Sequence, residues 1–431
     1  MPIASNSATS ASSSIHSIGR HPECRALARL APWLALGALI AGCVTTPPPP
    51  APTPPTPPAP TPAPAALPAS YRAVAWSALP GWNEDRVQEA WPAFVAGCGA
   101  LVRSPARQAL WEPSCRAAAT VDGNSVSAVR AFFESHFSPY QVVGAEGRES
   151  GLITGYYEPL LAGSRTKTAR YSVPLYAVPD DLLTVDLTSL YPELKGKRVR
   201  ARVEGKTVVP YFPRADIDRG VASLDGKALV YVEDPVEAFF LEIQGSGRIK
   251  LDDGSVMRVG YADQNGHPYR SIGTVLIERG ELTLGQASMQ GIRAWGQKNR
   301  DKLPALLEEN PSYVFFREVP PPVPGTLDAQ IDGPFGSLGV PLLRERTLAV
   351  DTRAIPLGAP VYLATTYPLS TRPLQRLMLA QDTGGAIRGA VRGDFFWGFG
   401  DGAGREAGRM RQQGQMWMLW PKNAPLPTPA S

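Results

Sequence analysis

The decisive stretch of this 431-residue sequence reads Gln381-Asp382-Thr383-Gly384-Gly385-Ala386-Ile387, followed closely by Arg392-Gly393-Asp394-Phe395-Phe396. Each segment places an aspartate at or just after an apolar, strand-like run, and Asp351 ends a third such run, Leu348-Ala349-Val350. A single Asp in this position is most often a turn former or a helix cap. Three in one region favour a site built on carboxylates, and the pair Gly384-Gly385 would let backbone approach closely there.

The N-terminal residues 1–42 predict a secretory signal. Three arginines precede the apolar run Leu30–Ile40, which is far shorter than the roughly 20 apolar residues a membrane span needs. Cys43 follows Ile40-Ala41-Gly42, as in a bacterial lipobox, so we expect cleavage before Cys43 and lipidation of that residue. An ordinary cleaved signal with a chance cysteine is the alternative. By resemblance to other lipoproteins, the non-acidic Val44 favours the inner leaflet of the outer membrane, where multiple acyl chains anchor stably.

A linker is expected at residues 43–70. Its central part, residues 47–68, is almost entirely Pro, Ala and Thr and carries no charge, so it cannot bury a core. Polyproline II rises about 3.1 Å per residue, so this segment could extend roughly 70 Å from the membrane. Such a reach suits a polymer layer in the periplasm.

The composition of the processed chain limits its chemistry. Removing residues 1–42 takes three of 43 basic and one of 39 acidic residues, which leaves a net charge near +2 and no nucleic-acid signal. Apart from Cys43, only Cys98 and Cys115 remain, and in an oxidising compartment a disulfide is their simplest account. Only His136 and His267 survive processing, so a zinc site or a Cys-His protease is disfavoured. We therefore expect carboxylate chemistry without a metal or cofactor.

Periodicity gives a coarse secondary structure. Apolar residues recur three or four positions apart over Asp85–Val102 and Val126–Phe137, which predicts two helices, the second with Asn124 and Ser125 as possible caps. A third helical stretch is predicted at Gln286–Glu309, and strands from Tyr313 to Leu419. Other short β-type runs predict strands at Leu152–Tyr157, Val208–Phe212, Ala228–Val232 and Phe239–Gln244.

Short strands with helices confined to a few places favour β-barrels over a doubly wound sheet. We expect a mainly β fold with some α-helix. One barrel domain would use residues 71–165 and 319–424, including N-terminal helices, and a second, inserted β domain would occupy residues 166–318. Residues 425–431 are expected to form a disordered tail.

The aspartate segments resemble the three-aspartate 3D domain, and together with upstream motifs they resemble the MltA family of lytic transglycosylases. The resemblance covers roughly residues 75–422. The upstream motifs are Gly155-Tyr156-Tyr157-Glu158-Pro159, Phe239-Phe240-Leu241-Glu242-Ile243-Gln244-Gly245-Ser246-Gly247-Arg248, Tyr261-Ala262-Asp263-Gln264-Asn265-Gly266-His267-Pro268-Tyr269 and Asn310-Pro311-Ser312-Tyr313. The resemblance implies a double-psi β-barrel, a second β domain, and a groove between them that binds glycan.

The resemblance also implies a reaction and its residues. A lytic transglycosylase cleaves the β-1,4 bond between N-acetylmuramic acid and N-acetylglucosamine without water and leaves 1,6-anhydromuramic acid ends, in cell-wall turnover and remodelling. Asp394 matches the family's catalytic acid, and Asp382 and Asp351 match the other two aspartates, which we expect to orient and tune it. Burial by the neighbouring Phe395, Phe396 and Trp397, and the charge of Asp382, would raise the pKa of Asp394.

One carboxylate is sufficient for this chemistry. A glycoside hydrolase needs a second carboxylate for water or for a covalent intermediate. Here the attacking group is the muramyl 6-hydroxyl, which is already tethered to the sugar, and such intramolecular attack has effective molarities on the order of 10⁵ M or more.

Several polar and aromatic residues are candidates for contacts with the sugar, although each could instead pack in a core or a turn. The predicted substrate-binding residues are Tyr156, Tyr157, Glu158, Glu242, Gln244, Ser246, Tyr261, Asn265, Gly384, Gly385 and Trp397. Expected partners are peptidoglycan glycan strands, the outer membrane through the lipid, and wall synthases or scaffold proteins. Two other functions stay open on the sequence alone: a hydrolytic glycosidase with Asp382 or Asp351 activating water, and a non-catalytic, expansin-like wall-binding lipoprotein.

Overall fold

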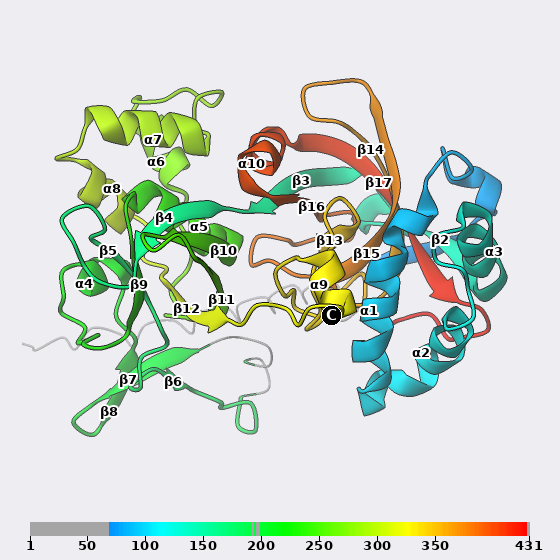
Figure 1. Cartoon of the computed structure of the whole chain (residues 1–431), viewed down its shortest axis with the longest axis horizontal. Helices are drawn as coiled ribbons and strands as arrows, with labels where there is room; N and C mark the ends of the chain where they lie inside the picture. The colour runs from blue at the N-terminus through cyan, green and yellow to red at the C-terminus, as the bar shows by residue number, and fades with distance from the viewer. Residues whose placement is uncertain (1–68, 192–193, 195–198, 429–431) are drawn as a thin grey trace, which may run out of the picture. The chain divides into compact units, whose positions relative to one another are not determined.

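The computed structural model describes residues 69–191, 194 and 199–428 (Figure 1). The predicted signal, Cys43, most of the linker and residues 429–431 of the predicted tail lie outside the described residues. The described residues all belong to one compact unit. Within the described ranges, no helix combines the length and apolar character needed to span a bilayer.

The structure contains short helices and many strands. The helices are α1 (Trp91–Val102), α2 (Pro105–Ala118), α3 (Val126–His136), α4 (Arg214–Asp218), α5 (Pro235–Gln244), α6 (Ile272–Glu278), α7 (Met289–Lys298), α8 (Leu303–Glu308), α9 (Leu327–Ile331) and α10 (Gly400–Arg409). The strands are β1 (Ser70–Ala73), β2 (Phe137–Val143), β3 (Gly151–Glu158), β4 (Leu160–Ser164), β5 (Val173–Tyr176), β6 (Leu183–Thr184), β7 (Arg200–Glu204), β8 (Thr207–Pro210), β9 (Ala228–Val232), β10 (Ser246–Leu251), β11 (Val256–Gln264), β12 (Val314–Val319), β13 (Thr347–Val350), β14 (Pro360–Thr366), β15 (Pro373–Asp382), β16 (Gly393–Phe399) and β17 (Arg411–Pro421).

The first sheet closes into a barrel. Its order is β1-β2-β17-β14-β15-β13-β16-β3, and an additional pairing of β17 with β3 closes a ring of six strands. The ring mixes pairings, since β13 runs parallel to β15 and β16 runs parallel to β3, while the others are antiparallel. Leu348, Phe395 and Met418 are fully buried in its core. Strands from both ends of the folded chain thus build the barrel.

The second sheet has the order β12-β11-β10-β4-β9-β5, and β6, β7 and β8 form a separate small sheet. The first strand of the six-stranded sheet along the chain is β4, which starts at Leu160, before the domain boundary at residue 166 expected from the sequence. Helices α5 to α8 pack on one another through a separate apolar cluster that includes Phe239, Leu276 and Trp295. The prediction of a β-rich fold in two parts is confirmed, and among the described residues no strand pairing closes the second sheet into a ring as it does the first.

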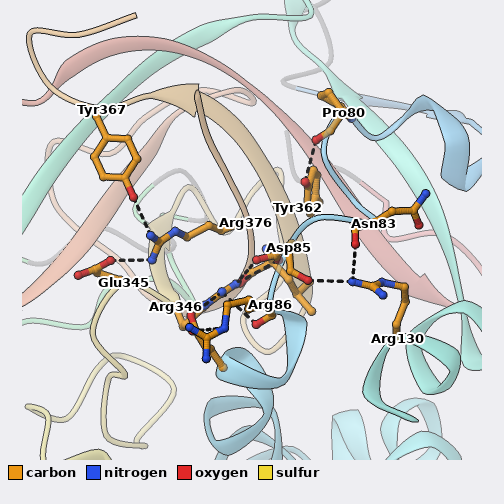
Figure 2. Close-up of polar contacts among 12 residues, drawn as sticks. Pro80, Asn83, Asp85, Arg86, Arg130, Glu345, Arg346, Tyr362, Tyr367 and Arg376 are labelled. Atoms are coloured by element: carbon orange, nitrogen blue, oxygen red, sulfur yellow. Dashed lines mark hydrogen bonds and ion pairs between the residues drawn. The ribbon is translucent and has the colours of Figure 1, made fainter. Parts of the chain in front are cut away.

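A buried charge network ties the N-terminal segment to the barrel (Figure 2). Arg346, which precedes β13, pairs with Asp85 at 2.9 Å, and the N–H of Leu377 donates to the same carboxylate at 2.7 Å. Both charged side chains are almost fully buried. On β14, the hydroxyl of Tyr362 donates to the carbonyl of Pro80 at 2.7 Å. These contacts fix the start of β13, the middle strand of the candidate site.

The predicted N-terminal helices and disulfide are confirmed. The first helical stretch is a 3-10 turn at Val87–Ala90 followed by α1, and Ser125 caps α3 by accepting the N–H of Ala128. Cys98 and Cys115 form a disulfide between α1 and α2, with 5.5 Å between their Cα atoms. The sequence did not predict α2, because proline lies at its start and again inside it.

The strand predicted at Phe239–Gln244 is wrong, because this segment is the second half of α5. Asp234 caps the helix by accepting two backbone N–H groups of the first turn, and Gly245 ends it with φ 77°. Short apolar runs do not distinguish helix from strand, and here the Asp-Pro start and the final glycine decide. The helix predicted at Gln286–Glu309 is two helices, α7 and α8, and the predicted strands after Tyr313 are interrupted by α9 and α10.

Candidate active site

Two of the three aspartates lie in one row across neighbouring barrel strands. Ala349 of β13 is the register partner of Asp382 on β15 and of Asp394 on β16, and Asp394 in turn pairs with Thr154 on β3. Residues paired in this way project from the same face of a sheet. At roughly 4.8 Å per strand, the two aspartate Cα atoms lie about 10 Å apart with a small side chain between them. The closed barrel therefore brings together carboxylates from separate segments.

Asp394 is half-buried and has few stabilising donors. The hydroxyl of Thr154 donates to Asp394 Oδ1 at 2.6 Å, and Arg392 Nη2 donates to the same hydroxyl oxygen at 2.9 Å. Burial raises the pKa of Asp394 to about 6, and the charge of Asp382 adds to this, although Thr154 and Arg392 act in the opposite direction. A carboxyl with this pKa can be protonated or ionised near neutral pH.

Asp382 is surrounded by donors. Its Oδ1 accepts both the N–H and the hydroxyl of Ser337 at 3.0 Å, and its Oδ2 accepts the hydroxyl of Tyr156 at 3.0 Å. Burial raises the pKa of Asp382, while these donors and the N–H of Thr383 lower it. Burial and the charges of Asp382 and Asp394 hold the pKa of Tyr156 well above its ordinary value, which keeps this phenol a donor.

Asp351 lies at the end of β13 and has a different environment. Arg353 Nη2 lies 2.6 Å from its Oδ2, and the N–H of Gly389 donates to Oδ2 at 2.7 Å. Burial raises the pKa of Asp351, but the hydrogen bonds from Arg353 and Gly389 outweigh it and lower the pKa overall. Asp351 thus braces the loop that leads into β16, and among the described residues it has no hydrogen bond to Asp382 or Asp394.

The apolar wall of the site differs from the one predicted. Phe396 lies on the same face of β16 as Asp394 and contacts Tyr156, with 5.1 Å between ring centroids. Phe395 and Trp397 alternate to the other face and pack in the barrel core, where the indole N–H of Trp397 donates to the sulfur of Met410. Trp397 therefore offers no face to a sugar.

A groove of about 1,130 Å³ runs beside the aspartate row and is lined from both sheet systems. Of the predicted residues, those in its lining are Tyr156, Glu158, Glu242, Gln244, Ser246, Tyr261, Asp382, Gly384 and Gly385. Asp394 is not in the lining, but its charge acts on Tyr156, which is. The predicted residues outside the lining are Asp394, Asp351, Tyr157, Asn265 and Trp397.

Several predicted binding residues have structural partners. Asn265 is buried and its amide bonds four backbone groups of the loops around it, so it organises those loops. Glu158 accepts a hydrogen bond from Arg248 Nε at 2.9 Å, and Glu242 pairs with Arg214 at 2.6 Å. Gln244 accepts the N–H of Tyr157, which leaves its NH₂ group available at the groove.

The sequence reasoning missed Thr154 and Ser337. Thr154 had a usable signal, because Thr154, Tyr156 and Glu158 alternate along β3 and so share a face with one another. Ser337 had none, since its loop reaches Asp382 only through the fold. The groove also includes Tyr269 and Phe335, two exposed rings that fit stacking on sugars.

The chain matches two family descriptions and curated relatives. Residues 152–317 match the MltA specific insert domain, and residues 346–420 match the 3D domain. Membrane-bound lytic murein transglycosylase A of Escherichia coli K12 is 33% identical over 294 residues, which cover 66% of this chain and 69% of that protein. The chain belongs to the MltA family. As a member, it is a lytic murein transglycosylase, an enzyme that acts on peptidoglycan.

Solved structures of MltA proteins agree with this assignment. MltA from Neisseria gonorrhoeae, in a monoclinic form, is 40% identical with a TM-score of 0.73, over 84% of this chain and 95% of that chain. E. coli MltA with bound chitohexaose is 27% identical with a TM-score of 0.57, over 83% of this chain and 92% of that chain. The family assignment supports a lytic transglycosylase over both alternatives left open by the sequence.

Proposed function

We propose that Asp394 is the single acid and base of the reaction. As the neutral acid it protonates the oxygen that links N-acetylmuramic acid to N-acetylglucosamine. As the carboxylate it then takes the proton from the muramyl 6-hydroxyl, whose oxygen attacks C1 and closes the 1,6-anhydro ring. The proton count balances, and water is not consumed. The observation that carries the proposal is the place of Asp394 in the aspartate row, half-buried and with the Thr154 hydroxyl as its one direct side-chain hydrogen-bond donor, where burial raises its pKa to about 6.

The other two aspartates support Asp394. Asp382 holds donors on both oxygens, so in the pair the negative charge is better accommodated on Asp382 and the proton on Asp394. Asp351 orients the loop before β16 through Gly389. This division of labour favours the single-carboxylate mechanism over hydrolysis, because both oxygens of Asp382 already accept hydrogen bonds from Ser337 and Tyr156.

The glycan strand is proposed to lie in the groove. The chitohexaose bound by the E. coli relative supports a linear amino-sugar polymer as the ligand. Gln244 and Ser246 supply amide and hydroxyl groups, Tyr261 and Tyr269 supply rings, and the Gly384-Gly385 backbone allows close approach, all within one lining. Glu158 and Glu242 stabilise the wall of the groove through their ion pairs with Arg248 and Arg214.

We further propose that the mature chain is a periplasmic lipoprotein, lipidated at Cys43 and held on the outer membrane by its proline-rich linker. Wall synthases or scaffold proteins are proposed partners. Replacing Cys43 by Ser should release the protein from the membrane fraction without changing its activity on isolated sacculi. Retention of the variant in that fraction would refute the anchor.

Asp394→Asn tests the catalytic proposal. General acid-base catalysis contributes about 10²- to 10⁴-fold, so release of anhydromuropeptides from sacculi should fall by at least about 100-fold. Asp225→Asn is the control, because Asp225 is exposed and this substitution also removes one negative charge, but away from the groove. Mass spectrometry in ¹⁸O-water should show anhydro ends without label. Labelled reducing ends formed by the parent protein, or unimpaired release by Asp394→Asn, would overturn the proposal.

A further inference from the structure

A second cavity, of about 970 Å³, lies on the insert side of the molecule. It is lined by β5, α4, the start of α5, the ends of α7 and α8, and β12. Only Glu242 and Val314 line both this cavity and the groove, and the Glu242 carboxylate accepts the N–H of Val314 at 2.9 Å. This wall separates the cavity from the groove, and we call it the insert cavity.

Most charged groups in the insert cavity are already paired. The pairs are Arg214 with Glu242, Arg219 with Glu308, Arg293 with Asp234 and Glu237, and Glu233 with Arg170 outside the lining. The exceptions in the lining are Asp218 and Arg300. Within residues 69–191, 194 and 199–428, neither of these two exposed side chains makes a hydrogen bond or an ion pair. The cavity thus presents one open carboxylate and one open guanidinium, on α4 and just after α7.

The rest of the lining is largely apolar, and the volume of the cavity is that of a typical ligand pocket. Ligand pockets typically enclose roughly 300–1,000 Å³ and combine apolar walls with a few polar groups that orient the ligand. The apolar lining residues include Leu175, Val236, Phe239, Leu303, Leu307 and Phe316. A sugar chain would need many hydroxyl partners, whereas this wall suits alkyl side chains.

We infer that the insert cavity binds a short peptide that carries both a free ammonium and a free carboxylate, the chemistry of the stem peptides attached to peptidoglycan strands. Asp218 takes the ammonium, Arg300 takes a carboxylate, and the alkyl part of the peptide lies on the apolar wall. Glycan in the groove and peptide in the insert cavity would then be held on the two sides of the Glu242–Val314 wall. The peptide site does not depend on which residue performs the chemistry.

Calorimetric titration of the full mature chain carrying Asp394→Asn tests the site without turnover. The probe is synthetic L-Ala-γ-D-Glu-meso-diaminopimelyl-D-Ala, alone and with its amino groups acetylated. Asp218→Asn and Arg300→Gln should each weaken binding of the free tetrapeptide by roughly tenfold, as for a charge-assisted hydrogen bond in a partly exposed site. The acetylated peptide should bind the parent and Asp218→Asn equally, because the variant removes only the ammonium partner.

Matched controls are Asp225→Asn and Arg107→Gln, at two exposed residues whose side chains make no hydrogen bond or ion pair in the described part of the chain. They should bind the tetrapeptide like the parent. Equal tetrapeptide binding by the parent, Asp218→Asn and Arg300→Gln would overturn the inference. The inference would also be overturned if chitohexaose competed with the tetrapeptide for the parent protein but not for Asp218→Asn, because the insert cavity would then be a glycan site. Thermal unfolding of each variant, measured in the same buffer, separates loss of binding from loss of fold.

Discussion

Replacing Asp394 by Asn should stabilise the protein at neutral pH while removing its activity. The pKa of this carboxyl is raised from its ordinary 3.8 to about 6 in the folded state. Each pKa unit corresponds to about 1.36 kcal/mol, so ionisation of Asp394 costs the folded state on the order of 3 kcal/mol. The asparagine carries no charge and its amide oxygen can still accept the hydrogen bond from Thr154. Because Asp394 is half-buried and retains some hydration, we expect a gain of about 2 kcal/mol.

The pH dependence gives the sign of this effect. Between pH 3.8 and about 6 the folded protein binds more protons at Asp394 than the unfolded chain does, so this group lowers the stability as the pH rises. Below about pH 4 both states are protonated and the parent and variant should unfold alike. Above about pH 6 the full difference should be present and constant.

Urea unfolding of the parent and of Asp394→Asn from pH 3.5 to 8 measures this difference directly. Other carboxyls with raised pKa values, such as Asp382 and Glu158, are common to both proteins and largely cancel. Asp225→Asn should show no such pH-dependent gain. A variant that is no more stable than the parent at pH 8, or equally stabilised at pH 4, would refute the argument that an uncompensated buried charge sits at Asp394.

Three further predictions follow from the same contacts. The kcat/KM on sacculi should fall as the pH rises through about 6, because Asp394 must be protonated to act as the acid. In the pH-rate profile of Thr154→Val this fall should occur at higher pH, because the variant loses a hydrogen bond that lowers the pKa of Asp394. Arg346→Ala should lower the free energy of unfolding by about 3–5 kcal/mol in urea, since it leaves a buried carboxylate unpaired, whereas exposed Arg107→Ala should change it little. Reducing the Cys98–Cys115 disulfide should cost roughly 3 kcal/mol of stability in calorimetry and leave the pH limb in place.

The sequence predicted the kind of fold and the identity of the aspartates because both leave local signals. Strands alternate, turns use Gly, Pro, Asn and Asp, and Asp394 precedes the apolar run Phe395–Trp397 within a long recognisable motif. The same alternation could have placed Phe395 and Trp397 in the core and Phe396 at the site, since residues of opposite parity in a strand face opposite sides. That error came from treating neighbours in sequence as neighbours in space.

Other features have no local signal. The strand that separates Asp382 from Asp394 lies earlier in the chain, so the role of Ala349 as the spacer between them depends on barrel closure. Likewise, Ser337 reaches Asp382 from an irregular loop, and the insert cavity joins helices that the sequence reasoning had merged or assigned to strand. Long-range pairing, rather than propensity, decides each of these positions.

The two aspartates of the row differ little in sequence, and their surroundings decide which one holds the proton. Both carboxyls are half-buried and both pKa values are raised, so two charges in this row would be costly. Asp382 receives donors on both oxygens from Ser337 and Tyr156, and each of these donors stabilises an ionised carboxylate. Asp394 receives one direct side-chain hydrogen bond, from Thr154. In the proposed mechanism the first negative charge of the pair therefore resides on Asp382, and its field adds to the burial that raises the pKa of Asp394 to about 6. Ala349 stands between the two aspartates in the register of the sheet, which fits a mechanism in which Asp394 alone acts on the glycosidic oxygen.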